Sequence, residues 1–289
     1  MTATDLIRVI DNASSVTTIF PDLHQWYKTY KDYSKLIHPD ICSEPGSAEA
    51  FRKLNDYKRE IEHGKEIPDD AGSLTFFPTR VEMEGDEDLI KISMYNHKVL
   101  LSLTDKSTQH FKQYIPESSG LSMFKLRERA VPLANVGTLK QEHVNFILSR
   151  MLEFVTWVNG VGWMHAGINP SSIAIIPHNH GMQCVSFYHM ARLGGILRTV
   201  SGRYAHLYPA TVFRDKKAGS NVDLELAKRT AVWLLGDKSG IGNSLRRTHN
   251  PDFLNFIRKD HWNPLDCYKE YREMLSRNYD TRQFHILNL

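Results

Sequence analysis

The sequence predicts an α+β protein in which a helical N-terminal region precedes a small antiparallel sheet and a mainly helical C-terminal region. Apolar residues recur at three- and four-residue steps up to residue 61, and short strand-like runs separated by polar turns begin at Leu74. Helical spacing returns from Gln141. With 289 residues, 41% of them hydrophobic, the chain can bury a small core and a medium one. We therefore expect domains over residues 1–65 and 74–289. A polar linker over 66–73 would join them, because Pro68 and Gly72 interrupt regular secondary structure there.

Two helices are predicted in the N-terminal region, over residues 27–37 and 51–61. Their apolar positions share one face of each helix: Leu23, Trp26, Tyr30, Tyr33 and Ile37 on the first, and Phe51, Leu54, Tyr57 and Ile61 on the second. Asp22 with Gln25 is expected to cap the first helix, Ser47 the second, and Gly64 is expected to end it. Residues 5–9 can form a further short helix. Two helices joined by a short loop would bury their apolar faces against each other.

The loop between these helices opens with His38, Pro39 and Asp40. Pro39 fixes its own φ and disfavours the α conformation at His38, so the first helix must stop there. Two antiparallel helices joined at His-Pro-Asp are similar to the J-domain of the DnaJ co-chaperone family, over about residues 5–65. This resemblance implies that the corner engages a DnaK-type ATPase chaperone and triggers its ATP hydrolysis.

A basic face runs along the first helix and leads to this corner, formed by Lys28, Lys31 and Lys35. A lysine face of this kind can simply be solvated. Beside His-Pro-Asp, it also suits an acidic docking surface and fast electrostatic encounter with the chaperone.

In the second region we expect strands over residues 74–77, 81–83, 89–94, 99–103 and 123–129. A long buried helix from Gln141 to Gly160 follows, then a loop that opens on His165, a strand, a hairpin turn at Asn179-His180-Gly181 and another strand. This order is similar to that of protein kinases over about residues 74–275. Within that resemblance His165 matches the histidine of the kinase catalytic loop, H-R-D-L-x-x-x-N.

Three positions depart from the kinase pattern. The catalytic aspartate falls on Gly167, the metal-binding asparagine falls on Ser172, and the D-F-G segment falls on Phe187-Tyr188-His189. The nucleotide-binding lysine would be Lys91 or would be replaced by Ser102, depending on which strand is matched. Because kinase catalysis depends on positioned metal ions and a base, the resemblance implies a pseudokinase without phosphoryl transfer.

Helices are also expected over 222–235, which Asp223 opens, and around two later apolar sets, Phe253, Phe256 and Ile257, and Tyr268, Tyr271 and Leu275. For these residues we prefer a role in a packed core. His178, His180 and Cys184 lack a fourth ligand at a zinc-like spacing, so we expect no metal, and we expect no other cofactor.

The net charge of +3 is too small to indicate nucleic-acid binding, although basic residues cluster over 192–217. Cys42, Cys184 and Cys267 are widely spaced, which fits a reducing compartment. Neither a signal peptide nor a membrane span is apparent, so we expect a cytoplasmic protein. Proteins that fuse a J-domain to a degenerate kinase look like ones carried by bacteriophages, and the host cytoplasm would then be the location.

We therefore expect a co-chaperone that acts on a DnaK-type ATPase chaperone and whose second domain selects an unidentified client or a location. Two other functions stay open: an atypical kinase-fold enzyme that transfers phosphoryl or nucleotidyl groups with the help of Lys91, and a scaffold with a vestigial J-domain.

Overall fold

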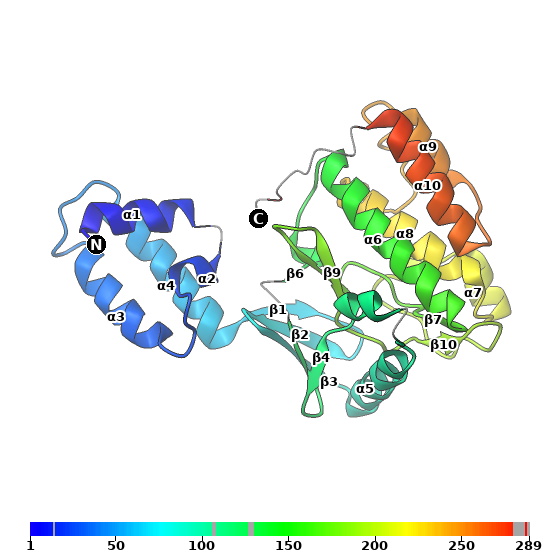
Figure 1. The fold of residues 1–289 in the computed structure, drawn as a ribbon, viewed down its shortest axis with the longest axis horizontal. Helices are drawn as coiled ribbons and strands as arrows, with labels where there is room; N and C mark the ends of the chain where they lie inside the picture. The colour runs from blue at the N-terminus through cyan, green and yellow to red at the C-terminus, as the bar shows by residue number, and fades with distance from the viewer. Residues whose placement is uncertain (14, 106–107, 127–129, 280–286, 288–289) are drawn as a thin grey trace.

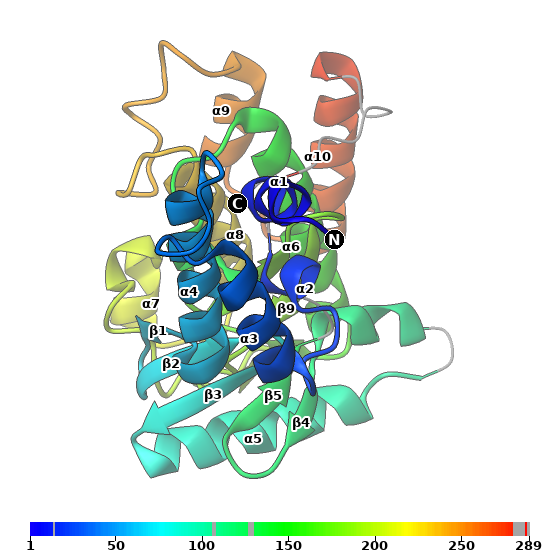
Figure 2. The same cartoon turned by 90° about the vertical axis from the view of Figure 1, so that its left-hand side faces the viewer.

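The computed structural model describes residues 1–289 except 14, 106–107, 127–129, 280–286 and 288–289. The described residues form an α+β structure with a helical N-terminal region, a small antiparallel sheet and a larger, mainly helical region. The N-terminal helices lie at one end of the long axis of the molecule and the C-terminal helices lie toward the other (Figure 1). In Figure 2, which looks along that axis, the N-terminal helices stand in front of the rest of the chain.

The N-terminal helices are α1 (Ala3–Asn12), α2 (Val16–Ile19), α3 (Trp26–Ile37) and α4 (Ser47–His63). They enclose a separate core whose fully buried members include Leu6, Ile10, Phe20, Ile37 and Leu54. The His38 ring contacts Phe51, whereas the Tyr30 hydroxyl, further back along α3, donates a 2.8 Å hydrogen bond to Asn55, further along α4. The two predicted helices are confirmed, and these contacts show that they run antiparallel.

The starts of both helices differ from the prediction. The Asp22 side chain accepts a hydrogen bond from the His24 N–H at 2.9 Å, and α3 begins later, after Gln25, which caps it without a side-chain hydrogen bond. Ser47 is the first residue of α4 rather than its cap, and its hydroxyl donates to the Cys42 carbonyl at 3.2 Å. Gly64 ends α4 as predicted.

Residues 66–73, which we expected to be a linker, instead continue directly into the sheet. Gly64 alone separates α4 from β1 (Lys65–Pro68), which pairs with β2 (Gly72–Phe77) through a turn at residues 69–71. The polar composition was misleading because β1 is an edge strand in which only Ile67 is buried. The expectation of an irregular connection is therefore wrong.

The sheet has the strand order β1-β2-β3-β5-β4, with every neighbouring pair antiparallel. Its other strands are β3 (Arg80–Gly85), β4 (Glu117–Ser119) and β5 (Met123–Lys125). Leu74 pairs with Met83 and Val81 with Phe124, which places these buried side chains on one face. The strands expected at 74–77 and 81–83 are confirmed. Of the strand expected over 123–129, residues 127–129 lie outside the described part.

The strands expected at 89–94 and 99–103 are wrong, because these residues form one helix, α5 (Glu87–Ser102). Asp86 caps it by accepting hydrogen bonds from the Asp88 and Leu89 N–H groups at 2.9 and 3.0 Å. Its buried residues Ile90, Met94, His97 and Leu100 recur at steps of four, three and three residues across both of the runs that were expected to be strands.

The remaining region is built around α6 (Gln141–Gly160), which packs against α8 (Ser220–Leu234) and α10 (Pro264–Asn278). The other helices and 3₁₀ turns are η1 (Gln109–Tyr114), η2 (Leu133–Asn135), η3 (Ala205–Leu207), α7 (Ala210–Asp215) and α9 (Pro251–Arg258). Two small sheets are formed by β6 (Val131–Pro132), β8 (Ile173–Ile176) and β9 (Gly181–Cys184), and by β7 (Trp163–Met164) with β10 (Ala191–Arg192). Within the described part of the chain, none of the helices combines the length and the hydropathy that a membrane span requires.

Candidate functional site

The His38-Pro39-Asp40 corner lies at the join of α3 and α4 and faces solvent. His38 has φ −59° and ψ 128°, so the helix stops before Pro39 as predicted. The His38 carbonyl accepts hydrogen bonds from the Ile41 and Cys42 N–H groups at 2.9 and 2.8 Å, which close a tight turn. The His38 ring packs edge-on against Phe51, with 4.8 Å between ring centroids, while the Asp40 side chain is 85% exposed. The imidazole is thus anchored, Asp40 Oδ2 lies 3.6 Å from His38 Nδ1, and the carboxylate is exposed to a partner.

The lysine face of α3 is also open to solvent. Lys28, Lys31 and Lys35 are all exposed, and none forms an ion pair with a residue that the structure describes. The Lys31 ammonium lies 4.5 Å from the centroid of the Tyr27 ring, which holds it along the helix. The positive charge of this face remains available to an outside partner.

The second set of predicted residues lies in a buried loop that begins at His165. The N–H groups of His165 and Ala166 each donate a 2.7 Å hydrogen bond to the Asp223 carboxylate at the start of α8. Burial raises the pKa of Asp223 to about 6, although these hydrogen bonds act to lower it. Burial lowers the pKa of His165 to about 3, and its Nε2 lies 3.0 Å from the Ser186 carbonyl. His165 is therefore a neutral packing residue at neutral pH.

The structure brings Gly167, Ser172 and Phe187, which we expected at degenerate kinase positions, together around this loop. The Ser172 hydroxyl donates to the Gly167 carbonyl at 2.6 Å, and the His165 and Phe187 ring centroids are 5.6 Å apart. A Cβ on Gly167 would lie 2.9 Å from Cδ2 of His189, so a carboxylate at this position requires the neighbouring ring to move.

Helix α5, which replaces two expected strands, holds Phe187, the first residue of the segment that we expected in place of D-F-G. The Phe187 N–H donates to the Ser93 hydroxyl at 2.9 Å, and the Asn96 side-chain amide donates to the Phe187 carbonyl at 2.8 Å. Both backbone groups of Phe187 are satisfied from the helix, and its ring is fully buried.

The turn between β1 and β2 closes over the loop that begins at His165. Asp70 Oδ2 lies 2.9 Å from Nε2 of His189, and its Oδ1 accepts a 2.9 Å hydrogen bond from Ser201. The other ring nitrogen of His189 lies 2.9 Å from the Thr199 hydroxyl. We call Asp70, His189, Thr199 and Ser201 the Asp70 cluster. Burial alone would raise the pKa of Asp70, but the hydrogen bonds from His189 and Ser201 and the charge of His189 lower it overall.

A further hydrogen bond ties the same turn to the loop. The Ser171 hydroxyl donates to the Pro68 carbonyl at 3.2 Å. Asp69 is buried, which raises its pKa, and the nearby Tyr188 phenol acts in the opposite direction. The Pro68 carbonyl is therefore bonded to the loop that follows His165, and Asp69 and Asp70 come next in the same turn.

Neither candidate for a nucleotide-binding lysine position lies in the sheet. Lys91 and Ser102 are both on α5, where Lys91 is exposed and pairs with Glu87 at 3.2 Å. The Ser102 hydroxyl donates to the Val99 carbonyl in its own helix at 2.7 Å. The expectation that one of them occupies that strand position is wrong, because the strands on which it depended form a helix.

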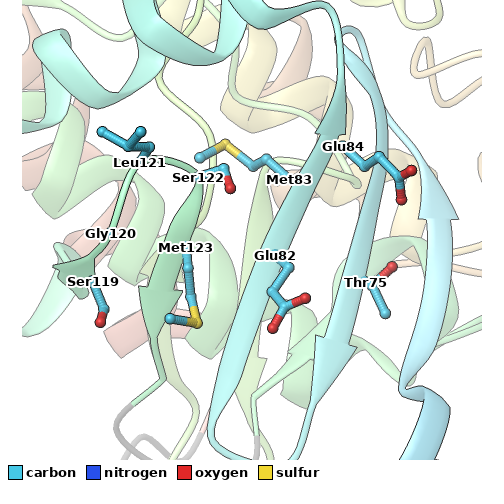
Figure 3. A pocket seen from close by; sticks show the side chains of 9 residues that line it. All are labelled: Thr75, Glu82, Met83, Glu84, Ser119, Gly120, Leu121, Ser122 and Met123. Atoms are coloured by element: carbon cyan, nitrogen blue, oxygen red, sulfur yellow. The ribbon is translucent and has the colours of Figure 1, made fainter.

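A separate shallow pocket of about 430 Å³ lies on the sheet (Figure 3). Its lining includes the carboxylates of Glu82 and Glu84 on β3 and the β4–β5 turn, where Leu121 is 88% exposed. Among the described residues, no lysine or arginine lines it. An acidic, solvent-open pocket of this kind does not suit a phosphate group.

Sequence reasoning missed the Asp70 cluster, because its partners are 119 and 131 residues apart along the chain. Aspartates such as Asp69 and Asp70 are common in turns, so the local sequence contains no signal for the Asp70 cluster. Among the described residues, no three His, Cys, Asp or Glu side chains come together in a way that could hold a metal ion.

We compared the chain with models of known protein families and with curated proteins, and found no match in either comparison.

Proposed function

We propose that this protein is a J-domain co-chaperone that recruits a DnaK-type ATPase chaperone and stimulates its ATP hydrolysis. The observation that carries the proposal is the exposed His38-Pro39-Asp40 corner at the join of the antiparallel helices α3 and α4. The anchored imidazole and the exposed carboxylate beside it form a rigid polar tip, which loses little conformational entropy when a partner binds.

The lysine face supports the same function. Lys28, Lys31 and Lys35 line the helix that leads to the tip, and an exposed row of like charges steers an acidic partner into encounter. In this proposal the three lysines orient the chaperone, and His38, Pro39 and Asp40 trigger it.

For the kinase-like region, we propose a role in selecting a client or a location, without phosphoryl transfer. In protein kinases a lysine on the third strand clamps the nucleotide phosphates and metal ions neutralise their charge. Here β3 contains no lysine, and the turn above the loop carries Asp69 and Asp70. Neither side chain supplies the positive charge that binding of a nucleotide phosphate needs.

The test of the chaperone function is Asp40→Asn in an assay of ATP hydrolysis by a DnaK-type chaperone. We expect the variant to stimulate ATP hydrolysis by the chaperone about tenfold less, or weaker still, because a charge-assisted contact between Asp40 and the chaperone is lost. The matched control is Asp32→Asn, which neutralises another exposed carboxylate on α3 and should leave stimulation unchanged. Undiminished stimulation by the Asp40 variant would remove the proposal.

A capture experiment from lysate distinguishes this function from a scaffold with a vestigial J-domain. The wild-type chain should retain a DnaK-type chaperone and Asp40→Asn should not. Equal capture by both proteins would contradict the assigned role of the corner.

For the enzyme alternative, the melting temperature of the full chain is measured with ATP and magnesium. We expect no shift, and a clear increase would support a nucleotide-binding enzyme.

A further inference from the structure

An exposed basic and apolar surface lies beside α7, formed by two segments that are distant in sequence. Residues 192–198 and 213–217 together contain five basic residues and one acidic residue, a net charge of +4, whereas the whole chain carries +3. The acidic residue, Asp215, is bound in a bidentate contact by Arg214. Four cations thus have no ion-pair partner among the described residues: Arg192, Arg198, Lys216 and Lys217. We call the two segments the basic face.

Apolar side chains are exposed among these charges. Ile196 is 74% exposed, Phe213 50% and Leu193 38%. Exposed aliphatic residues that are grouped with like charges indicate an interaction site more than single exposed apolar residues do. Aliphatic and basic groups together match a partner that offers apolar side chains and carboxylates.

The backbone holds this surface in place. Ile196 and Lys217 form an antiparallel bridge, which directs their side chains to the same side. The Leu197 N–H donates to the Lys216 carbonyl at 2.8 Å, and the Ala218 N–H donates to the Gly195 carbonyl at 2.9 Å. Leu197 and Ala218 are buried beneath it. The exposed Ile196 therefore sits on a fixed platform, which reduces the entropy lost on binding.

We propose that the basic face binds an acidic, amphipathic segment of a polypeptide. Charge complementarity selects the acidic partner, and Leu193, Ile196 and Phe213 select apolar residues within it. A single-stranded nucleic acid fits less well, since only one exposed side chain of the face, Phe213, offers a ring for base stacking. This inference rests on the proposed function in one respect: the segment would belong to the client of the co-chaperone.

The location of the basic face suits that role. Figure 1 shows β10 and α7 toward the end of the long axis opposite the N-terminal helices. A polypeptide on the basic face and a chaperone on the α3–α4 corner would therefore not compete for the same surface.

The test uses the full chain and a fluorescent synthetic peptide that repeats Glu-Leu-Glu-Phe, with anisotropy as the measurement. We expect binding that weakens with added salt. The double variant Lys216→Glu with Lys217→Glu should weaken it by about tenfold, because two attractions become repulsions. The matched control is Arg246→Glu with Arg247→Glu, which makes the same change of charge at exposed residues elsewhere and should have less than a twofold effect. Equal weakening by both double variants would overturn the proposal, since binding would then follow overall charge.

The apolar part is tested with Ile196→Ser, which should weaken binding severalfold at every salt concentration. Leu121→Ser, at an even more exposed leucine outside the basic face, should not. Unchanged unfolding midpoints show that all variants are folded. Tighter binding of an oligothymidine than of the peptide would overturn the proposal in favour of nucleic acid. Self-association that the Lys216/Lys217 double variant abolishes would overturn it in favour of a second copy of this chain.

Failure here can be told apart from failure of the chaperone function. Asp40→Asn should lose ATPase stimulation and keep peptide binding, and the Lys216/Lys217 double variant should do the reverse. Loss of peptide binding in Asp40→Asn would contradict the assignment of the two activities to separate surfaces.

Discussion

Replacement of Asp223 tests whether one buried carboxylate organises the loop at His165. Its oxygens accept the N–H groups of His165 and Ala166 at 2.7 Å, and its side chain is fully buried. In Asp223→Ala both donors lose their partner in the buried interior. Each unsatisfied buried group costs about 1–3 kcal/mol, so we expect a loss of about 2–6 kcal/mol in the free energy of unfolding. Ala166 would be affected most, because it is held at φ +58°.

The same carboxylate predicts a pH dependence with a definite sign. The pKa of Asp223 is about 6 in the folded protein, against an ordinary value of 3.8. Between these values the folded state binds a proton that the unfolded state does not, so this group adds stability as the pH falls. From pH 8 to pH 5 the gain is about 1.4 kcal/mol. Asp223→Asn cannot titrate and should lack this part of the pH dependence.

The assay is urea unfolding of the wild type, Asp223→Ala and Asp223→Asn at pH 5 and pH 8. If the alanine variant lies within 1 kcal/mol of the wild type, the carboxylate does not hold the loop. An equal pH dependence in the wild type and the asparagine variant would show that another group titrates.

Three further predictions concern the join of the two regions, the Asp70 cluster and the lysine face. Gly64→Ala should destabilise the protein by about 2–5 kcal/mol in thermal unfolding, because φ is +66° and the new Cβ would lie 2.7 Å from Thr75 Cγ2. The control Gly120→Ala, at φ +70° in open space, should cost only about 1–2 kcal/mol. Equal losses in the two variants would exclude a close approach at Gly64. Asp70→Ala should cost about 3 kcal/mol in urea unfolding, since it leaves His189 buried without its carboxylate. The pKa of Asp70 is lowered, so its charged form should contribute fully above pH 3.8 and progressively less as the pH falls below that value. A difference between wild type and variant that does not shrink with falling pH would refute this. A variant in which Lys28, Lys31 and Lys35 are all replaced by glutamate should associate with the chaperone at least about tenfold more slowly at low salt in stopped-flow measurements. The effect should be smaller at high salt, and a salt-independent effect would refute electrostatic steering.

Local rules made the N-terminal helices and their corner predictable. Pro39 ends a helix whatever surrounds it, and the apolar spacing of residues 26–37 and 51–61 follows from helical geometry alone. Gly64 ended α4 as predicted, because a glycine with φ +66° is a local helix stop. The starts of the helices were less predictable, since Asp22, Gly46 and Ser47 are all polar or flexible residues that can serve as caps.

The amino-acid sequence by itself determined where α3 must stop and that His38, Pro39 and Asp40 follow it without helical support. Only the tertiary structure decided that residues 87–102 form one helix, whose Ser93 and Asn96 hold Phe187, and that the Asp69-Asp70 turn closes over the His165 loop. The physical reason is the sequence separation over which each interaction acts. A proline acts on its neighbours, whereas the bonds of Asp70 join residues 119 and 131 positions apart, which no local pattern encodes.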